Sequence, residues 1–119
     1  MSTIYIRKNG SAIAEIAGGG DIKKNGNTIA YIRDNEIRKS ASGSHLEARS
    51  NTIYDHGNAV FEICGKDIKK AGKTIAELHG NDVRQNGSTI ATVDGISDLS
   101  QCKPIVIAAI LAGIGIIAF

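Results

Sequence analysis

Basic side chains recur in pairs along this sequence, each pair just before a short turn. Nine of the 14 lysines and arginines occupy these positions. The pairs are Arg7-Lys8, Lys23-Lys24, Arg38-Lys39 and Lys69-Lys70, and the equivalent positions of two further segments hold Tyr54-Asp55 and Arg84-Gln85. Ammonium groups gathered at one place attract anions such as lipid headgroups, each worth about 1 kcal/mol near a charged membrane surface. The chemistry that this pattern offers is therefore the binding of anions.

Acidic side chains recur between the basic pairs, at the other turns of the pattern. They are Asp21, Asp34, Glu36, Asp67, Asp82 and Asp94. If the two kinds of turn lie at opposite ends of one structure, that structure is basic at one rim and acidic at the other. The net charge is only +2, whereas nucleic-acid-binding proteins need a concentrated basic face. We therefore expect no nucleic-acid partner.

Three other groupings contain residue types that are used in metal binding or catalysis. Cys64 and His79 occupy equivalent turn positions, but two strand spacings of ~4.8 Å separate them, whereas zinc needs four ligands converging within ~2.3 Å. Asp55-His56 is a turn dipeptide with no nucleophile and base pair beside it. Gly18-Gly19-Gly20 lacks the Lys-Ser/Thr and the following helix of a phosphate-binding loop. We expect no catalytic residue, no metal and no cofactor.

An internal repeat of 15 or 16 residues sets the positions of all these residues. Six units begin at an aliphatic residue: Ile6, Ile22, Ile37, Ile53, Ile68 and Val83. The third unit is degenerate, with Ser-Ala-Ser-Gly at its turn and His45-Leu46 in place of an aliphatic. We expect a single domain, 1–119, in which the six repeats occupy residues 1–94, a linker residues 95–103 and an apolar helix residues 104–119.

Each unit has the pattern of a β-hairpin. Asn-Gly, as at Asn9-Gly10, stands between β-branched runs and favours a type I′ turn, because both turn residues there need φ > 0. The two-residue turn predicts the pairs Ile6 with Ile13, Ile22 with Ile29, Ile53 with Val60, Ile68 with Ile75 and Val83 with Ile90. One spacing disagrees, since Ile75 and Leu78 are an odd number apart. Either the second strand of each unit carries a bulge, or its last aliphatic faces outward.

Two architectures can use six such units, a closed barrel and a β-solenoid with one unit per coil. The Asn-Gly turns favour the barrel, and so does the tail. Every residue from Ile105 to Phe119 is apolar or glycine, which predicts a helix that is enclosed by protein or lies in lipid. Its length of roughly 24 Å falls short of a typical membrane crossing. We predict an all-β fold, a six-hairpin, twelve-strand antiparallel up-and-down barrel enclosing a C-terminal hydrophobic α-helix, with membrane anchoring as the alternative for the tail.

Strand alternation divides the basic residues of this barrel into an inner and an outer row. The inner row, on the face of the inward aliphatics, is Lys8, Lys24, Lys39 and Lys70, and we take these as the candidate lipid-binding residues. The outer row is Arg7, Lys23, Arg38, Lys69 and Arg84. The alternative is that these lysines interact with the chain's own helix and not with a ligand. A helix that enters at the acidic rim ends among them. Its negative dipole end and the Phe119 carboxylate would then neutralise them.

Hairpins of the form I-[RK]-K-N-G-x-T-I-A-x-I, followed by a C-terminal apolar helix, resemble the β-flower proteins. More remotely they resemble the tubby C-terminal barrel, in which a C-terminal hydrophobic helix threads twelve strands. The resemblance covers the whole chain, as a matter of pattern and topology. Tubby-type barrels bind phosphoinositides and the related scramblase-like proteins associate with membranes, so the resemblance implies a membrane-surface role. It carries no binding residue over to a position of this chain.

These observations predict a non-enzymatic barrel that associates with membranes or anionic lipid through its basic rim. The alternative is a structural or protein-interaction module with no small ligand, and an enzyme ranks third. The first ten residues carry charges in place of the apolar stretch of a secretory signal. Cys64 and Cys102 form no C-x-x-C pair, in keeping with a reducing compartment. We therefore expect a cytoplasmic protein, peripheral to a membrane.

Overall fold

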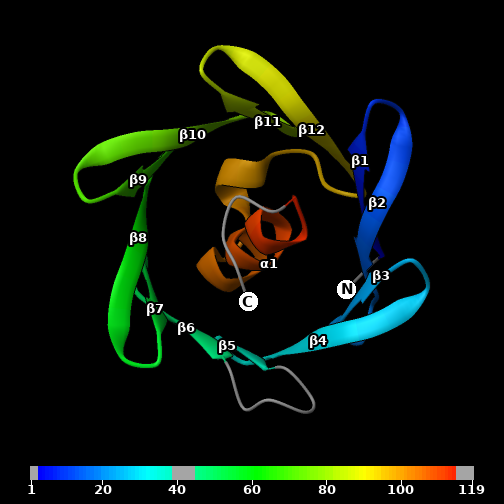
Figure 1. Cartoon of the computed structure of the whole chain (residues 1–119), viewed down its shortest axis with the longest axis horizontal. Helices are drawn as coiled ribbons and strands as arrows, with labels where there is room; N and C mark the ends of the chain where they lie inside the picture. Colours follow the sequence, from blue (N-terminus) through cyan, green and yellow to red (C-terminus); the bar gives the residue numbers. More distant parts are fainter. Residues whose placement is uncertain (1–2, 39–44, 115–119) are drawn as a thin grey trace.

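Twelve antiparallel strands close into a barrel around one helix (Figure 1). The computed structural model describes residues 3–38 and 45–114, so that Lys39 and Phe119 lie outside the described residues. In chain order the strands are β1 (Ile4–Lys8), β2 (Ser11–Ile16), β3 (Asp21–Lys24), β4 (Asn27–Arg33), β5 (Glu36–Arg38), β6 (His45–Arg49), β7 (Thr52–Asp55), β8 (Asn58–Cys64), β9 (Asp67–Lys70), β10 (Lys73–His79), β11 (Asp82–Gln85) and β12 (Ser88–Asp94). Each strand pairs with its neighbours in sequence, and β1 pairs with β12. The predicted up-and-down barrel is confirmed.

The turns inside the hairpins have the backbone that the sequence predicts. Asn9 and Gly10 have φ of 53° and 81°. His56 and Ala71 adopt the same left-handed conformation, at 51° and 53°, although it costs a residue with a side chain about 1 to 2 kcal/mol. We call the end of the barrel formed by these turns, at residues 9–10, 25–26, 56–57, 71–72 and 86–87, the hairpin end. The opposite end, formed by residues 17–20, 34–35, 50–51, 65–66, 80–81 and 95–103, is the linker end.

The predicted cross-strand pairs of aliphatic residues are wrong, because the second strand of each of five hairpins carries a bulge. Ile6 pairs with Ala14, Arg7 pairs with Ala12, and Ile13 is the extra residue between them. The other four bulged residues are Ile29, Val60, Ile75 and Ile90. Two residues opposite one shift the alternation by one position, so that both aliphatics of the strand face inward. The bulge thus explains how aliphatic residues an odd number of positions apart can face the same side of the strand.

One backbone hydrogen bond ties each of five linkers to the hairpin that follows it. In each case the linker carbonyl accepts a hydrogen bond from a backbone N–H of the hairpin's second strand, with N···O distances of 2.7 to 2.8 Å. The acceptor and donor pairs are Gly20 with Ile32, Asn35 with Ala48, Asn51 with Ile63, Lys66 with Leu78 and Asn81 with Val93. Gly20 permits a close approach, since a Cβ there would lie 2.7 Å from the Ile32 carbonyl oxygen. Gly95 has φ of 101°, and its Cβ would lie 2.6 Å from the Thr3 oxygen. These contacts hold the linker end together.

The C-terminal helix, α1 (Pro104–Ile114), lies inside the barrel (Figure 1). Its 11 residues span about 16 Å, most of the 21 Å of the molecule's shortest axis. The side chains from Ile107 to Ala112 are all buried, and α1 contacts β1 to β7. The short helix η1 (Leu99–Gln101) contacts β10 at the linker end. For the described part of the tail, enclosure in protein is therefore correct, and no described helix is long and apolar enough to cross a membrane.

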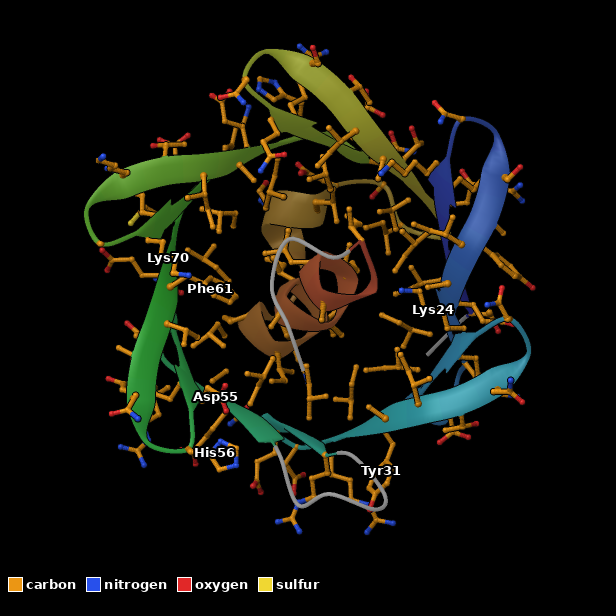
Figure 2. All side chains as sticks on the ribbon, viewed as in Figure 1. Lys24, Tyr31, Asp55, His56, Phe61 and Lys70 are labelled. Atoms are coloured by element: carbon orange, nitrogen blue, oxygen red, sulfur yellow. The ribbon has the colours of Figure 1, made fainter. Side chains whose placement is uncertain are left out.

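The inner wall is built to admit this helix. Small residues stand opposite the leading aliphatic in four hairpins: Ala14, Ala30, Ala76 and Ala91. The helix matches them with small residues of its own, and a Cβ on Gly113 would lie only 2.9 Å from Ile6 Cδ1. Phe61 of β8 holds the alanine position in the fourth hairpin and points toward the interior (Figure 2). A large ring fits there because α1 packs nearer to the strands from β1 to β7.

Candidate functional site

The inner-row lysines that the structure describes stand at the tips of separate hairpins. Lys8, Lys24 and Lys70 are the last residues of β1, β3 and β9, next to the turns, and all three are exposed. Figure 2 shows Lys24 and Lys70 on opposite walls of the barrel with α1 between them. They therefore surround the hairpin end and do not converge on one point.

The distance between tips follows from the pairing of neighbouring hairpins. β2 pairs with β3 only at Glu15 and Ile16, close to the linker, whereas the first hairpin pairs internally up to Lys8 and Ser11 at its turn. These two hairpins consequently spread apart toward their tips, as Figure 1 shows, although β6 and β7 stay paired up to Asp55. The first strand of a hairpin carries no extra residue, so Lys24 shares its face with the buried Ile22, two positions earlier. Lys8, Lys24 and Lys70 thus lie on the inner side of a flared rim.

Within the described residues, Lys8, Lys24 and Lys70 form no ion pair. The outer row differs. Arg7 Nε donates to Asp94 Oδ2 across the junction of β1 with β12, and Arg38 Nη2 lies 3.2 Å from Glu36 Oε2. Strand register also sets three outer-row residues directly opposite acids, in the pairs Glu15 with Lys23, Glu62 with Lys69 and Glu77 with Arg84.

On the outer wall, basic and acidic side chains therefore lie closer together than the sequence predicted, which placed them at opposite rims. The strands are short, so a long arginine side chain from the hairpin half reaches an acid of the linker half, as Arg7 reaches Asp94. Cross-strand pairs of opposite charge are mutually favourable. Two outer-row residues, Arg7 and Arg38, are ion-paired, and the other three stand opposite acids without forming an ion pair among the described residues. The described inner-row lysines stand opposite no acid.

Sequence reasoning missed one further lysine of this rim. Lys73 pairs directly with Lys70 across the Ala71-Gly72 turn, and both side chains are exposed. Two like charges directly opposite each other destabilise a hairpin, so this arrangement opposes local stability. The signal was present in the sequence, because the two-residue turn that set the aliphatic pairs also sets this pair. We define the tip lysines as Lys8, Lys24, Lys70 and Lys73.

An apolar ring lies inside the tip lysines. The five bulged residues, Ile13, Ile29, Val60, Ile75 and Ile90, are only partly buried, although they pack against the core. Each stands three positions after the second residue of its turn, on the second strand of its hairpin. The hairpin end consequently combines aliphatic side chains with a surrounding rim of ammonium groups.

One tip breaks the basic pattern. The β7–β8 turn carries Asp55 and His56, whose Oδ1 and Nδ1 atoms lie 2.6 Å apart, and both residues sit at the rim in Figure 2. This pair is exposed and contacts no nucleophile in the described structure. The rim is thus basic at three described tips and mixed at this one.

The linker end holds the groups with shifted pKa values. Hydrogen bonds from the Ser100 hydroxyl and N–H lower the pKa of Asp98, which caps η1. Burial, followed by the Asp98 charge, raises the pKa of the Cys102 thiol. Cys64 and Cys102 are both free cysteines, and residues 3–38 and 45–114 contain no group of three His, Cys, Asp or Glu side chains that could hold a metal ion.

Comparison of the chain with protein-family models, with curated proteins and with solved structures gave no match.

Proposed function

We propose that this barrel is a non-enzymatic module that binds anionic lipid at a membrane surface through its hairpin end. The observation that supports this most is the contrast between the two rows of basic residues. Two outer-row residues are ion-paired and the other three stand opposite acids, whereas Lys8, Lys24 and Lys70 do neither among the described residues and surround an apolar ring. Ammonium groups around aliphatic side chains match the two layers of a membrane surface, headgroup and hydrocarbon.

The family that the sequence suggests agrees with this proposal. We infer a β-flower barrel, with the tubby-type barrels as more distant relatives, from the repeated hairpins and the central helix. Two free cysteines suit a reducing compartment, so we place the binding on the cytoplasmic side.

The test is cosedimentation with vesicles of phosphatidylcholine, with and without phosphatidylserine, at low salt. The variant replaces Lys8, Lys24 and Lys70 with Gln, and its matched control replaces Lys23, Lys69 and Arg84 with Gln. Both lose the same charge. At about 1 kcal/mol for each lysine, the inner variant loses roughly 100-fold in affinity for anionic vesicles.

The outer control should lose only a little affinity for anionic vesicles, through its lower net charge. The loss of affinity in both variants should shrink as added salt brings the Debye length below ~10 Å. Equal losses in the two variants would show that net charge, and not the rim, causes binding. An absence of binding to anionic vesicles at low salt would leave the structural or protein-interaction module as the better assignment.

A further inference from the structure

A pocket of about 550 Å³ opens at the linker end, on the opposite side of the barrel from the tip lysines. It lies between the start of α1, the linker 17–20 and the turn at Asp34. Its lining includes the aliphatic Ile4, Ile32 and Ile105, the glycines of the linker, and the charged Asp34 and Lys103. The volume falls within the range of ~300 to 1,000 Å³ that is typical of small-ligand sites, which are mostly apolar with few polar groups.

The walls of this pocket are aliphatic. Ile4 and Ile105 are buried at 3% and 1% exposure, and Ile32, Ile96 and Val106 are half-buried. No aromatic side chain of the described residues lines the pocket, so these residues offer no partner for ring stacking. Such a surface suits the aliphatic chain of a ligand, because the association removes apolar area of both from water.

The pocket coincides with an interruption of the repeat. The linkers at 34–35, 50–51, 65–66 and 80–81 each have two residues between strands, whereas four residues, Ala17 to Gly20, join β2 to β3. Three of the four are glycines. A Cβ built on Gly19 meets nothing within 4 Å, so this wall is open because it carries no side chains. Functional sites are expected at positions where a repeat departs from its regular pattern.

The polar groups of the pocket set the charge of the ligand. Lys103 and Asp34 are both exposed at its edge, and their opposite charges would balance. The first turn of α1 carries no acidic side chain, so the positive end of its dipole adds to Lys103. The balance therefore favours an anionic headgroup next to Lys103.

We propose that the linker-end pocket binds a fatty acid, with its chain against Ile4, Ile32 and Ile105 and its carboxylate at Lys103. This site is separate from the tip lysines and does not depend on the membrane role proposed for them. A free fatty acid and the acyl chain of a lysolipid share this chemistry, and the experiment distinguishes them by their headgroups.

The experiment is isothermal titration of the full chain with dodecanoate below its micelle concentration. Dodecylamine, dodecanol and a twelve-carbon lysophosphatidylcholine are the comparison ligands. We expect saturable binding of one dodecanoate per barrel, and weaker binding of the others because they lack the carboxylate. Absence of saturable dodecanoate binding, or binding of dodecylamine at least as tight, overturns the proposal. Tighter binding of the lysolipid than of dodecanoate overturns the assignment to a free acid.

Three variants locate the site. Gly19→Leu fills the pocket without forcing a left-handed backbone, so binding falls at least tenfold while the melting temperature stays unchanged. Lys103→Gln weakens dodecanoate binding several-fold, and Asp34→Asn strengthens it, since removing the negative charge removes repulsion. Asn also tolerates the φ of 53° at this position.

The control is the variant with Gln at Lys8, Lys24 and Lys70, which should bind dodecanoate like the wild type. Loss of binding in this control, with retention in Gly19→Leu, would place the fatty acid at the hairpin end and overturn the proposal. Failure of vesicle binding with intact dodecanoate binding would contradict only the proposed membrane function.

Discussion

Gly113 of α1 gives the sharpest test of a helix enclosed by the barrel. A Cβ at this position would lie 2.9 Å from Ile6 Cδ1 and 3.4 Å from Ala14 Cβ. Gly113→Ala needs only a small movement of the flexible end of Ile6, and it gains up to about 1 kcal/mol of helix propensity, so it should be neutral or slightly stabilising. Gly113→Leu adds three more carbons in the same direction. Overpacking of this kind costs about 1 to 3 kcal/mol.

Leucine and alanine have similar helix propensities, so the difference between the two variants isolates packing. At roughly 4 °C per kcal/mol for a domain of this size, the leucine variant should melt about 4 to 12 °C below the alanine variant in a thermal scan followed by circular dichroism. Combining Gly113→Leu with Ile6→Ala should recover part of that loss, because the smaller wall residue makes room for the leucine. Equal melting of the Leu and Ala variants, or strictly additive effects in the double variant, would refute close packing of α1 against β1 and β2.

Three further predictions concern stability. A chain that ends at Lys103 loses the buried face of α1 and should lose its cooperative melt, and a soluble, cooperatively folded truncation would contradict the central helix. Gly95→Ala should lower the melting temperature strongly, because its φ of 101° and the 2.6 Å approach of its Cβ to the Thr3 oxygen leave no room for a side chain; an unchanged melt would be inconsistent with this contact. Asp98→Ala removes the cap of η1 and should melt below wild type at pH 7. Since Ser100 lowers the folded pKa of Asp98, that stabilisation is complete above the unfolded pKa and is lost as pH falls through the folded pKa, so the difference should shrink below about pH 4.

The repeat made part of the inner row predictable from the sequence. The position of Lys24 at a tip, on the face of Ile22, follows from alternation along a short strand without irregularity. Which side chains of the second strand of a hairpin face inward could not be predicted in the same way. Ile29 and Ile32 can both face inward only if the strand bulges, and the choice depends on what fills the space inside the barrel.

Sequence alone predicted the turns and the strand order, and it limited the tail to a helix covered by protein or by lipid. Asn9-Gly10 requires a left-handed backbone whatever surrounds it, and a tail without polar side chains must be covered by something apolar. Tertiary structure decided the rest, because the remaining contacts join residues that are distant in the chain. Arg7 meets Asp94, 87 positions away, only because β1 pairs with β12. The linker-end pocket exists only where the start of α1 lies beside the glycines of the first linker. Neither contact has a local signal, since each is set by closure of the barrel and by the seating of α1 within it.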